Sequence, residues 1–500
     1  MVQNLRLTIL LFLLAFSVYF YTAGGHLYSA DEVANFLFAE SLLRWRIDIT
    51  SALPYAQTFG INVTRHMDVL PFSSSDGRIY FPMGDLIYSN GRIYSKYGLT
   101  EPVLIAAIHL FASALGASPW VTTEFVLYPV ITALTVCLVF LIGDLLLYSK
   151  ELSFLLALTY GFSTFAFPYA KFVNDGPLAT FFLLAALWLI IPSSRKPTTV
   201  RLTLSGAFLG FSILTRPFNI LLVPIVLIYA IWNSRSKFKD LMFLAIAPIV
   251  SLLLFSSYNY VRFGDVLEFG YASEQSLGAY TAGLVGVWGL LTSPGVGLIF
   301  YFPLTILLPT YYFYFLREHR REACLFMVIF VVTLGSAGSF NMWHGWDYWG
   351  PRYLLEPLPL LVLSLGSGIR NYLTSRYHQI LLVLLILLGF AINLLGVVIY
   401  FQTGFATVWR VYGGEWLEKA LYVPTLSPIY KHLILATTNS LPVQTDFGYG
   451  LTVPGKKFDL YLYDRYGLLS IIILLAIVSV ILLMIHRTFQ GTKNMGRKAS

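Results

Sequence analysis

Asp31 and Glu32 stand side by side near the start of a long polar stretch, and Lys96 stands near its end. A carboxylate can take a proton from a hydroxyl group, and a lysine ammonium can hold a phosphate. The stretch comprises residues 24–100, between one apolar segment and the rest of a very apolar chain. We therefore expect it to form one wall of an active site on the outer face of a membrane.

The composition indicates the scaffold that must position these residues. Hydrophobic residues make up 57% of the chain and charged residues 12%, whereas about 25% charge is usual in soluble proteins. Apolar runs that suit a bilayer recur along the chain, which predicts an all-α polytopic membrane protein with about 12 transmembrane helices. The expected spans are residues 5–23, 121–147, 152–168, 178–191, 202–214, 218–232, 241–257, 298–315, 325–337, 354–367, 380–400 and 468–485.

The short apolar segment 102–115 decides the predicted topology. If it does not cross the membrane, the basic clusters all fall on the cytoplasmic side, as the positive-inside rule requires. These clusters also explain the net charge of +8 without a nucleic-acid partner. We therefore predict a multi-pass protein of the cell membrane with both termini and residues 193–201 in the cytoplasm and residues 24–100 outside. Its expected parts are a membrane region (1–400), a small outer region of unknown role (401–466), and a last span with a basic tail (467–500).

This topology gathers the unusual residues at the outer face. The apolar pattern after Asp31 predicts an amphipathic helix along the membrane interface, with Asp31 and Glu32 in its first turn. Acids at a helix N-terminus are also explained by the helix dipole alone. Isolated outer cations suggest an anionic ligand such as a polyprenyl phosphate, or else contacts with lipid headgroups; they are Lys96, Lys171, Arg216, Arg262 and Arg352.

Two further outer segments have weaker signals. Asn174-Asp175-Gly176-Pro177 is typical of a turn between two spans, but it places Asp175 on the same face as Asp31. His344 and Asp347 are types that bind metals, but two such residues without a third are weak evidence for a site.

In their order and sidedness, these motifs resemble the membrane glycosyltransferases of the GT-C superfamily. The likeness is to the branch of the protein O-mannosyltransferases and the lipid A aminoarabinose transferase. It rests on Asp31-Glu32, Tyr94-Ser95-Lys96-Tyr97-Gly98, Lys171 to Pro177, Leu214-Thr215-Arg216-Pro217, Ser293-Pro294-Gly295-Val296-Gly297, and Trp343-His344-Gly345-Trp346 with Trp349-Gly350-Pro351-Arg352-Tyr353. The sequence departs from the family after the lysine, where Gly98-Leu99-Thr100-Glu101-Pro102 replaces the familiar Pro-Pro.

The resemblance implies transfer of a sugar from a polyprenyl-phosphate monosaccharide to a hydroxyl of a glycan, lipid or protein. Asp31 would be the general base, and Glu32 and Asp175 would orient the acceptor or the sugar. Lys96, Arg216 and Arg352 would bind the donor phosphate, with Asn174, Tyr94 and His344 as further orienting residues. The resemblance leaves room for a divalent metal, although the sequence shows no convincing ligand set.

Two other functions compete with this one. A transporter or flippase for a lipid-linked sugar would show inverted repeats and ionisable residues near the bilayer midplane. The sequence has no such repeat, and its charges gather at one face. A non-catalytic member of the same superfamily differs from an enzyme only in activity.

Overall fold

The computed structural model describes residues 2–54, 72–73, 79–80, 86–191, 198–233, 238–270, 282–438 and 456–499. The protein is mostly helical, and within these ranges 6 helices are long and apolar enough to cross a membrane. They are α1 (Val2–Thr22), α6 (Pro119–Leu145), α11 (Phe238–Phe263), α16 (Arg320–Ser339), α18 (Arg376–Val398) and α23 (Leu468–Ala499). The chain is therefore a polytopic membrane protein, as its hydropathy predicted.

Shorter helices fill the space between the long ones. They are α5 (Thr100–Ala114), α7 (Lys150–Phe162), α8 (Asp175–Ile190), α9 (Thr199–Thr215), α10 (Leu222–Asn233), α13 (Gly283–Thr292), α14 (Leu298–Tyr301), α15 (Leu308–Glu318) and α17 (Leu358–Tyr372), with 3-10 turns η1 (Pro168–Ala170), η2 (Pro217–Leu221), η3 (Pro303–Leu307) and η4 (Arg352–Leu354). Every expected span coincides with a helix, although the total of twelve spans stays a prediction. The expected span 298–315 is broken into α14, η3 and α15, because proline at Pro303 interrupts the helical hydrogen bonds. Helix α13 was not predicted.

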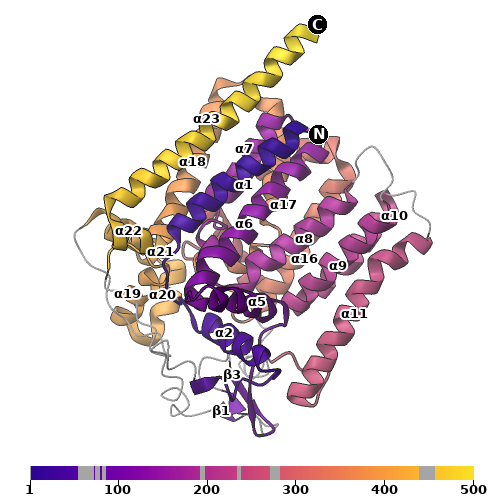
Figure 1. Ribbon diagram of the computed structural model, residues 1–500. Coiled ribbons are helices and arrows are strands. Elements are labelled where there is room, and N and C mark those ends of the chain that lie inside the picture. Colours follow the sequence, from indigo (N-terminus) through magenta and orange to yellow (C-terminus); the bar gives the residue numbers. More distant parts are fainter. Residues whose placement is uncertain are drawn as a thin grey trace.

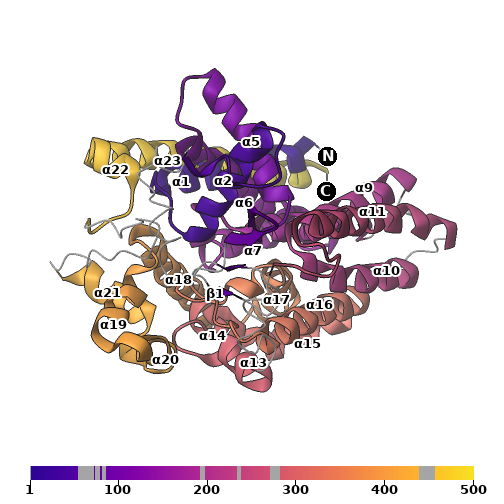
Figure 2. The same cartoon turned by 90° about the horizontal axis from the view of Figure 1, so that it is seen from below.

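The two termini lie at the same end of the molecule, and the first polar stretch lies at the other end (Figure 1). We call these the termini end and the loop end. Seen from below, from the loop end, the remaining helices surround α6 and α7 (Figure 2). Termini on one side agree with an even number of crossings. The side of the membrane that each end faces stays a prediction.

The loop end contains a small sheet that corrects the all-α expectation. Its four strands are antiparallel in the order β1-β2-β3-β4, with β1 at Phe72–Ser73, β2 at Ile79–Tyr80, β3 at Leu86–Ser89 and β4 at Arg92–Ser95. Asn90 and Gly91 join β3 to β4 with φ angles of 51° and 77°, which is the geometry that an Asn-Gly pair favours in a two-residue hairpin. The hairpin holds Lys96 directly after β4.

Helix α2 (Ala30–Leu43) begins where the sequence predicted, with Asp31 and Glu32 in its first turn. Residues 32–39 are all buried, so α2 belongs to the core of the loop end and is not an amphipathic interface helix. It packs against α5 and β4. Ser29 caps its N-terminus, and the Ser29 hydroxyl accepts a hydrogen bond from the Glu32 N–H. Because α2 is buried and packed on both elements, the backbone that carries Asp31 is held in place.

The described parts of the region 401–466, residues 401–438 and 456–466, form short helices beside α18 and α23. They are α19 (Thr403–Tyr412), α20 (Trp416–Tyr422), α21 (Pro428–Thr437) and α22 (Tyr461–Tyr466), with 3-10 turns η5 (Gly413–Glu415) and η6 (Pro424–Leu426). Helix α21 packs on α18, and α22 packs on α1 and α23. The chain therefore returns to the N-terminal helix just before its last long helix.

Candidate active site

Asp31 forms an ion pair with Arg352 at the loop end. The Asp31 Oδ2 atom lies 3.4 Å from Arg352 Nη1, and the two side chains keep 21% and 13% of their exposure. The guanidinium of Arg352 lies over the Tyr348 ring, 4.2 Å from its centroid. Burial alone would raise the pKa of the Asp31 carboxyl, but Arg352 and Lys96 outweigh it and hold that pKa below its usual range. Asp31 is therefore an ionised carboxylate with partial access to its surroundings.

Glu32 has quite different surroundings, although it is the next residue. Its side chain is fully buried. Its Oε2 accepts a hydrogen bond from the Tyr28 N–H at 2.5 Å, and its Oε1 accepts one from the Val173 N–H at 2.8 Å. Burial raises the pKa of the Glu32 carboxyl well above its usual value, while these two N–H groups oppose the rise. Glu32 thus joins the segment before α2 to the segment before α8.

A second carboxylate joins the same two segments. Asp459 Oδ1 lies 2.7 Å from His26 Nε2, and Lys171 Nζ donates to Asp459 Oδ2 at 2.8 Å. The Lys171 ammonium also donates to the backbone oxygens of Val397 and Asp459, at 2.8 and 2.9 Å. Only 1% of the Lys171 side chain is exposed, so its three donors serve the fold. The sequence predicted that Lys171 contacts an anionic ligand or lipid headgroups. In the structure its ammonium is instead bound by groups of the protein itself.

Together Glu32 and Asp459 form what we call the double brace. Each links residues 26–28 to residues 171–173, and Asp31 and Asp175 follow a few residues beyond. Burial would raise the pKa of Asp459, but Lys171 and His26 hold it well below its usual range. The brace therefore keeps an ionised pair inside the protein, where losing one partner is strongly destabilising.

Lys96 lies on the Asp31 side of the hairpin, since it contributes to lowering the Asp31 pKa. It is 9% exposed, and its ammonium lies 5.4 Å from the Tyr97 ring centroid. The motif around it docks on the end of α9, where the Leu99 N–H donates to Leu214 O at 3.0 Å. A Cβ at Gly98 would lie 2.2 Å from the same oxygen, so this close approach requires glycine. The residues after Lys96 are thereby held against the end of α9, which Arg216 follows.

Arg216 is engaged by two acids. Its Nε and Nη2 atoms donate to the two carboxylate oxygens of Asp175 at 2.8 and 2.6 Å, and its Nη1 donates to Glu356 Oε1 at 3.0 Å. The Arg216 side chain is 13% exposed and Asp175 25%, whereas Glu356 is 3% exposed. A bidentate arginine–carboxylate pair is strong and directional. A phosphate bound to Arg216 would have to compete with both carboxylates.

The remaining predicted residues have local roles in the structure. Asn174 caps α8, and its Oδ1 accepts a hydrogen bond from the Gly176 N–H at 3.0 Å. Tyr94 is 3% exposed and meets the Phe263 ring edge-on. His344 Nδ1 accepts from the Trp346 N–H at 3.0 Å, and burial lowers its pKa to about 4. His344 is therefore a neutral imidazole at pH 7.

Sequence reasoning missed three side chains that complete the site: His26, Glu356 and Asp459. They lie far along the chain from their partners, and His26 and Asp459 are separated by 433 positions. Asp459 is an acid just before the last span, which was a visible but ambiguous signal. In the part of the chain that the structure describes, no three His, Cys, Asp or Glu side chains are grouped so that they could hold a metal ion.

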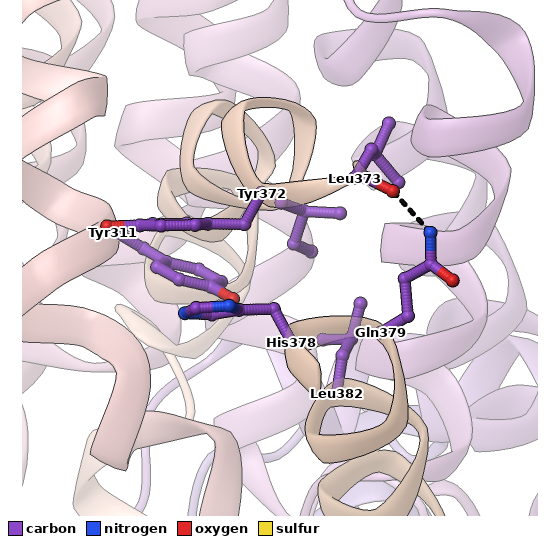
Figure 3. A pocket seen from close by; sticks show the side chains of 7 residues that line it. Tyr311, Tyr372, Leu373, His378, Gln379 and Leu382 are labelled. Carbon is purple, nitrogen blue, oxygen red and sulfur yellow. Dashed lines mark hydrogen bonds between the residues drawn. The ribbon is translucent and has the colours of Figure 1, made fainter. Parts of the chain in front are cut away.

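A small apolar pocket lies far from this site, among α15, α17 and α18 (Figure 3). There the His378 ring stacks on Tyr372 at 4.1 Å, and Gln379 donates to the Leu373 carbonyl. Tyr372 ends α17, whereas Glu356 precedes its first residue, so this pocket is at the termini end. It plays no part in the chemistry of Asp31.

Comparison with known proteins gives one family match and several similar structures. Residues 100–260 match the family described as dolichyl-phosphate-mannose-protein mannosyltransferase. No curated protein matches the chain. Three structures of the oligosaccharyltransferase of Archaeoglobus fulgidus are similar at 12% identity: the apo form (TM-score 0.41), a form tethered to an acceptor peptide (0.38), and AglB with an inhibitory peptide and a dolichol phosphate (0.39). They cover 71%, 69% and 71% of this chain, which spans 54%, 55% and 54% of theirs, about half their length.

The family match contains α5 to α10, including α5, α8 and α9, and with them Asp175 and Arg216. These are the elements against which the Asp31 and Lys96 segments pack. Residues 100–260 are therefore similar to the protein-mannosyltransferase family, which agrees with the resemblance that the motifs indicated.

Proposed function

We propose that the protein transfers a sugar from a polyprenyl-phosphate monosaccharide to an acceptor hydroxyl at the outer face of the cell membrane. Asp31 is the general base. The observation that carries the proposal is its setting: a partly exposed carboxylate, kept ionised by Arg352 and Lys96. The cations that keep Asp31 ionised are also suited to the phosphate of the donor.

The reaction balances with these groups alone. The acceptor oxygen bonds to the anomeric carbon, while the bond from that carbon to the phosphate oxygen breaks and its electron pair leaves with the phosphate. Attack opposite the leaving group inverts the anomeric centre. A carboxylate with a low pKa is a weak base, so Asp31 takes the proton as the acceptor oxygen becomes acidic during bond formation. Lys96 and Arg352 stabilise the charge that grows on the lipid phosphate.

The remaining charged residues of the site have supporting roles around Asp31, Lys96 and Arg352. The pairing of Arg216 with Asp175 and Glu356 favours a role in holding Asp175 where the sugar or acceptor binds. The double brace favours a positioning role for Glu32, because both its oxygens already accept backbone hydrogen bonds. The polyprenyl chain of the donor would lie in the bilayer, beside the apolar helices.

The test is to incubate purified protein with a panel of polyprenyl-phosphate sugars and to measure released polyprenyl phosphate. The wild type should consume one of them, and Asp31→Asn should bind it normally but turn over at least about 100-fold more slowly. A wild type that consumes no donor, or an Asp31→Asn variant with normal turnover, would overturn the proposal. The first result would favour a non-catalytic protein.

A further inference from the structure

Arg262, on the last turn of α11, lies fully buried behind the strand that holds Lys96. Its Nη1 donates to the carbonyl of Ser95 at 2.6 Å, and Ser95 is the residue directly before Lys96. Its Nη2 donates to Asn259 Oδ1, also at 2.6 Å. The guanidinium therefore fixes the backbone from which the Lys96 side chain starts.

The guanidinium of Arg262 also contacts two aromatic rings. It lies 3.7 Å from the Tyr258 ring centroid and 4.5 Å from that of Phe263. The Tyr258 ring in turn stacks on Phe38 of α2, with centroids 5.9 Å apart and planes 4° from parallel. Phe38 lies two helical turns beyond Asp31 on the same buried helix. One chain of contacts thus runs from α2 through Tyr258 and Arg262 to the Lys96 backbone.

A second segment, at Gly270, also contacts Lys96. A Cβ at Gly270 would lie 3.0 Å from Lys96 Cβ, so the backbone at Gly270 touches the start of this side chain. The Lys96 backbone is thus fixed by the hydrogen bond from Arg262 to Ser95, and its Cβ lies against Gly270. These contacts fix the point from which the Lys96 ammonium extends.

We infer that Arg262 is a positioning residue that sets the place of the Lys96 ammonium relative to Asp31, and thereby the affinity for the donor phosphate. This rests on the proposed function. An arginine is needed because its planar group donates in the plane and stacks through its faces at once; a lysine ammonium cannot do both. Arg262 itself does not touch the lipid phosphate.

The inference is tested by a double-mutant cycle on the full-length protein. The variants are Arg262→Lys, Lys96→Ala and the combination of both, and the probe is polyprenyl phosphate without a sugar. Arg262→Lys should weaken its binding about tenfold, the scale of one hydrogen bond to a charged group. The combined variant should bind no more weakly than Lys96→Ala alone, because Arg262 acts through Lys96.

Two further variants distinguish the positioning role of Arg262 from a general loss of structure. Arg317 also stacks on a ring, at 4.1 Å from Phe313, but it is exposed on α15, so Arg317→Lys should leave binding unchanged. Asn259→Ala removes one partner of Arg262 and leaves the Ser95 contact, so it should weaken binding by a smaller factor in the same cycle. It replaces Arg262→Lys if that variant does not fold.

Three results would overturn the inference: unchanged binding in both Arg262→Lys and Asn259→Ala, factors that multiply in the combined variant, or a lower thermal midpoint with unchanged binding. A wild type that binds polyprenyl phosphate but turns over no donor would refute the proposed function. The double-mutant cycle would still test the role of Arg262, because it measures binding alone. A wild type that does not bind polyprenyl phosphate would refute both.

Discussion

Glu32→Gln separates the positioning role of Glu32 from the base role of Asp31. The substitution keeps the shape but replaces one carboxylate oxygen by an NH2 group. One of the two backbone donors, at Tyr28 or Val173, then faces another donor in a fully buried place. An unsatisfied buried donor costs about 1–3 kcal/mol. We expect the free energy of unfolding to fall by that amount.

The expected effect on turnover follows from the same magnitude. If the misfit is relieved by movement of the residues around Asp31, a cost of about 1.4 kcal/mol leaves the aligned arrangement about tenfold less populated. Turnover of Glu32→Gln should therefore fall about tenfold. Turnover of Asp31→Asn should fall at least about 100-fold, because the proton acceptor is missing.

The assay pairs thermal unfolding with donor turnover for both variants. Glu40→Gln is the control on the same helix, since Glu40 lies away from Asp31 and pairs with the exposed Arg44; such i,i+4 pairs contribute about 0.5 kcal/mol or less. If Glu32→Gln were slower than Asp31→Asn and equally stable, Glu32 would be the base. Near-normal turnover in both would leave Asp31 and Glu32 as a helix-terminal acid pair without catalytic meaning.

Four other predictions have defined outcomes. Lys171→Met should destabilise the protein by up to about 3–5 kcal/mol, because the buried Asp459 then keeps only His26 as a partner. Adding Asp459→Leu should restore much of the thermal midpoint; a double variant no more stable than the single one would contradict this. Because the Asp31 pKa is lowered, Asp31 stays ionised as pH falls, so kcat/KM should not lose its base until about pH 4 or below. Burial raises the pKa of Asp347 to about 6, so Asp347→Asn should remove any change in rate seen near that pH, and a change that persists would have another source. A cysteine at Ser194, which lies outside the described residues, should resist a membrane-impermeant reagent in intact cells; labelling there would reverse the predicted topology.

Local signals in the sequence were enough for the framework of the site. Apolar runs predicted the helices, and the acids after Ser29 were correctly expected in the first turn of α2. Asn174 begins α8 as turn and capping chemistry suggests. These features depend on neighbours in the chain, which hydropathy and capping preferences describe.

The partners of the charged residues were beyond such signals. Arg216 and Asp175 are 41 positions apart, and Lys171 and Asp459 are 288 apart. A lone cation at a membrane border has the same local sequence whether it meets a phosphate or a buried acid, so only the packing distinguishes the two. The β3–β4 hairpin was recognisable from its Asn-Gly pair, but its strands are short and were passed over.

The double brace has a consequence for how the protein is made. A ribosome adds about 5–20 residues per second, so the 288 positions between Lys171 and Asp459 correspond to a delay on the order of 15–60 s. During that interval the nascent chain already carries Asp31 and Lys96, and later Arg352, while the Asp459 partner of Lys171 is still missing. The Glu32 half of the double brace can form early, whereas the Asp459 half forms only when the segment before the last span arrives. We therefore expect a chain released before residue 459 to be less stable than the full-length protein.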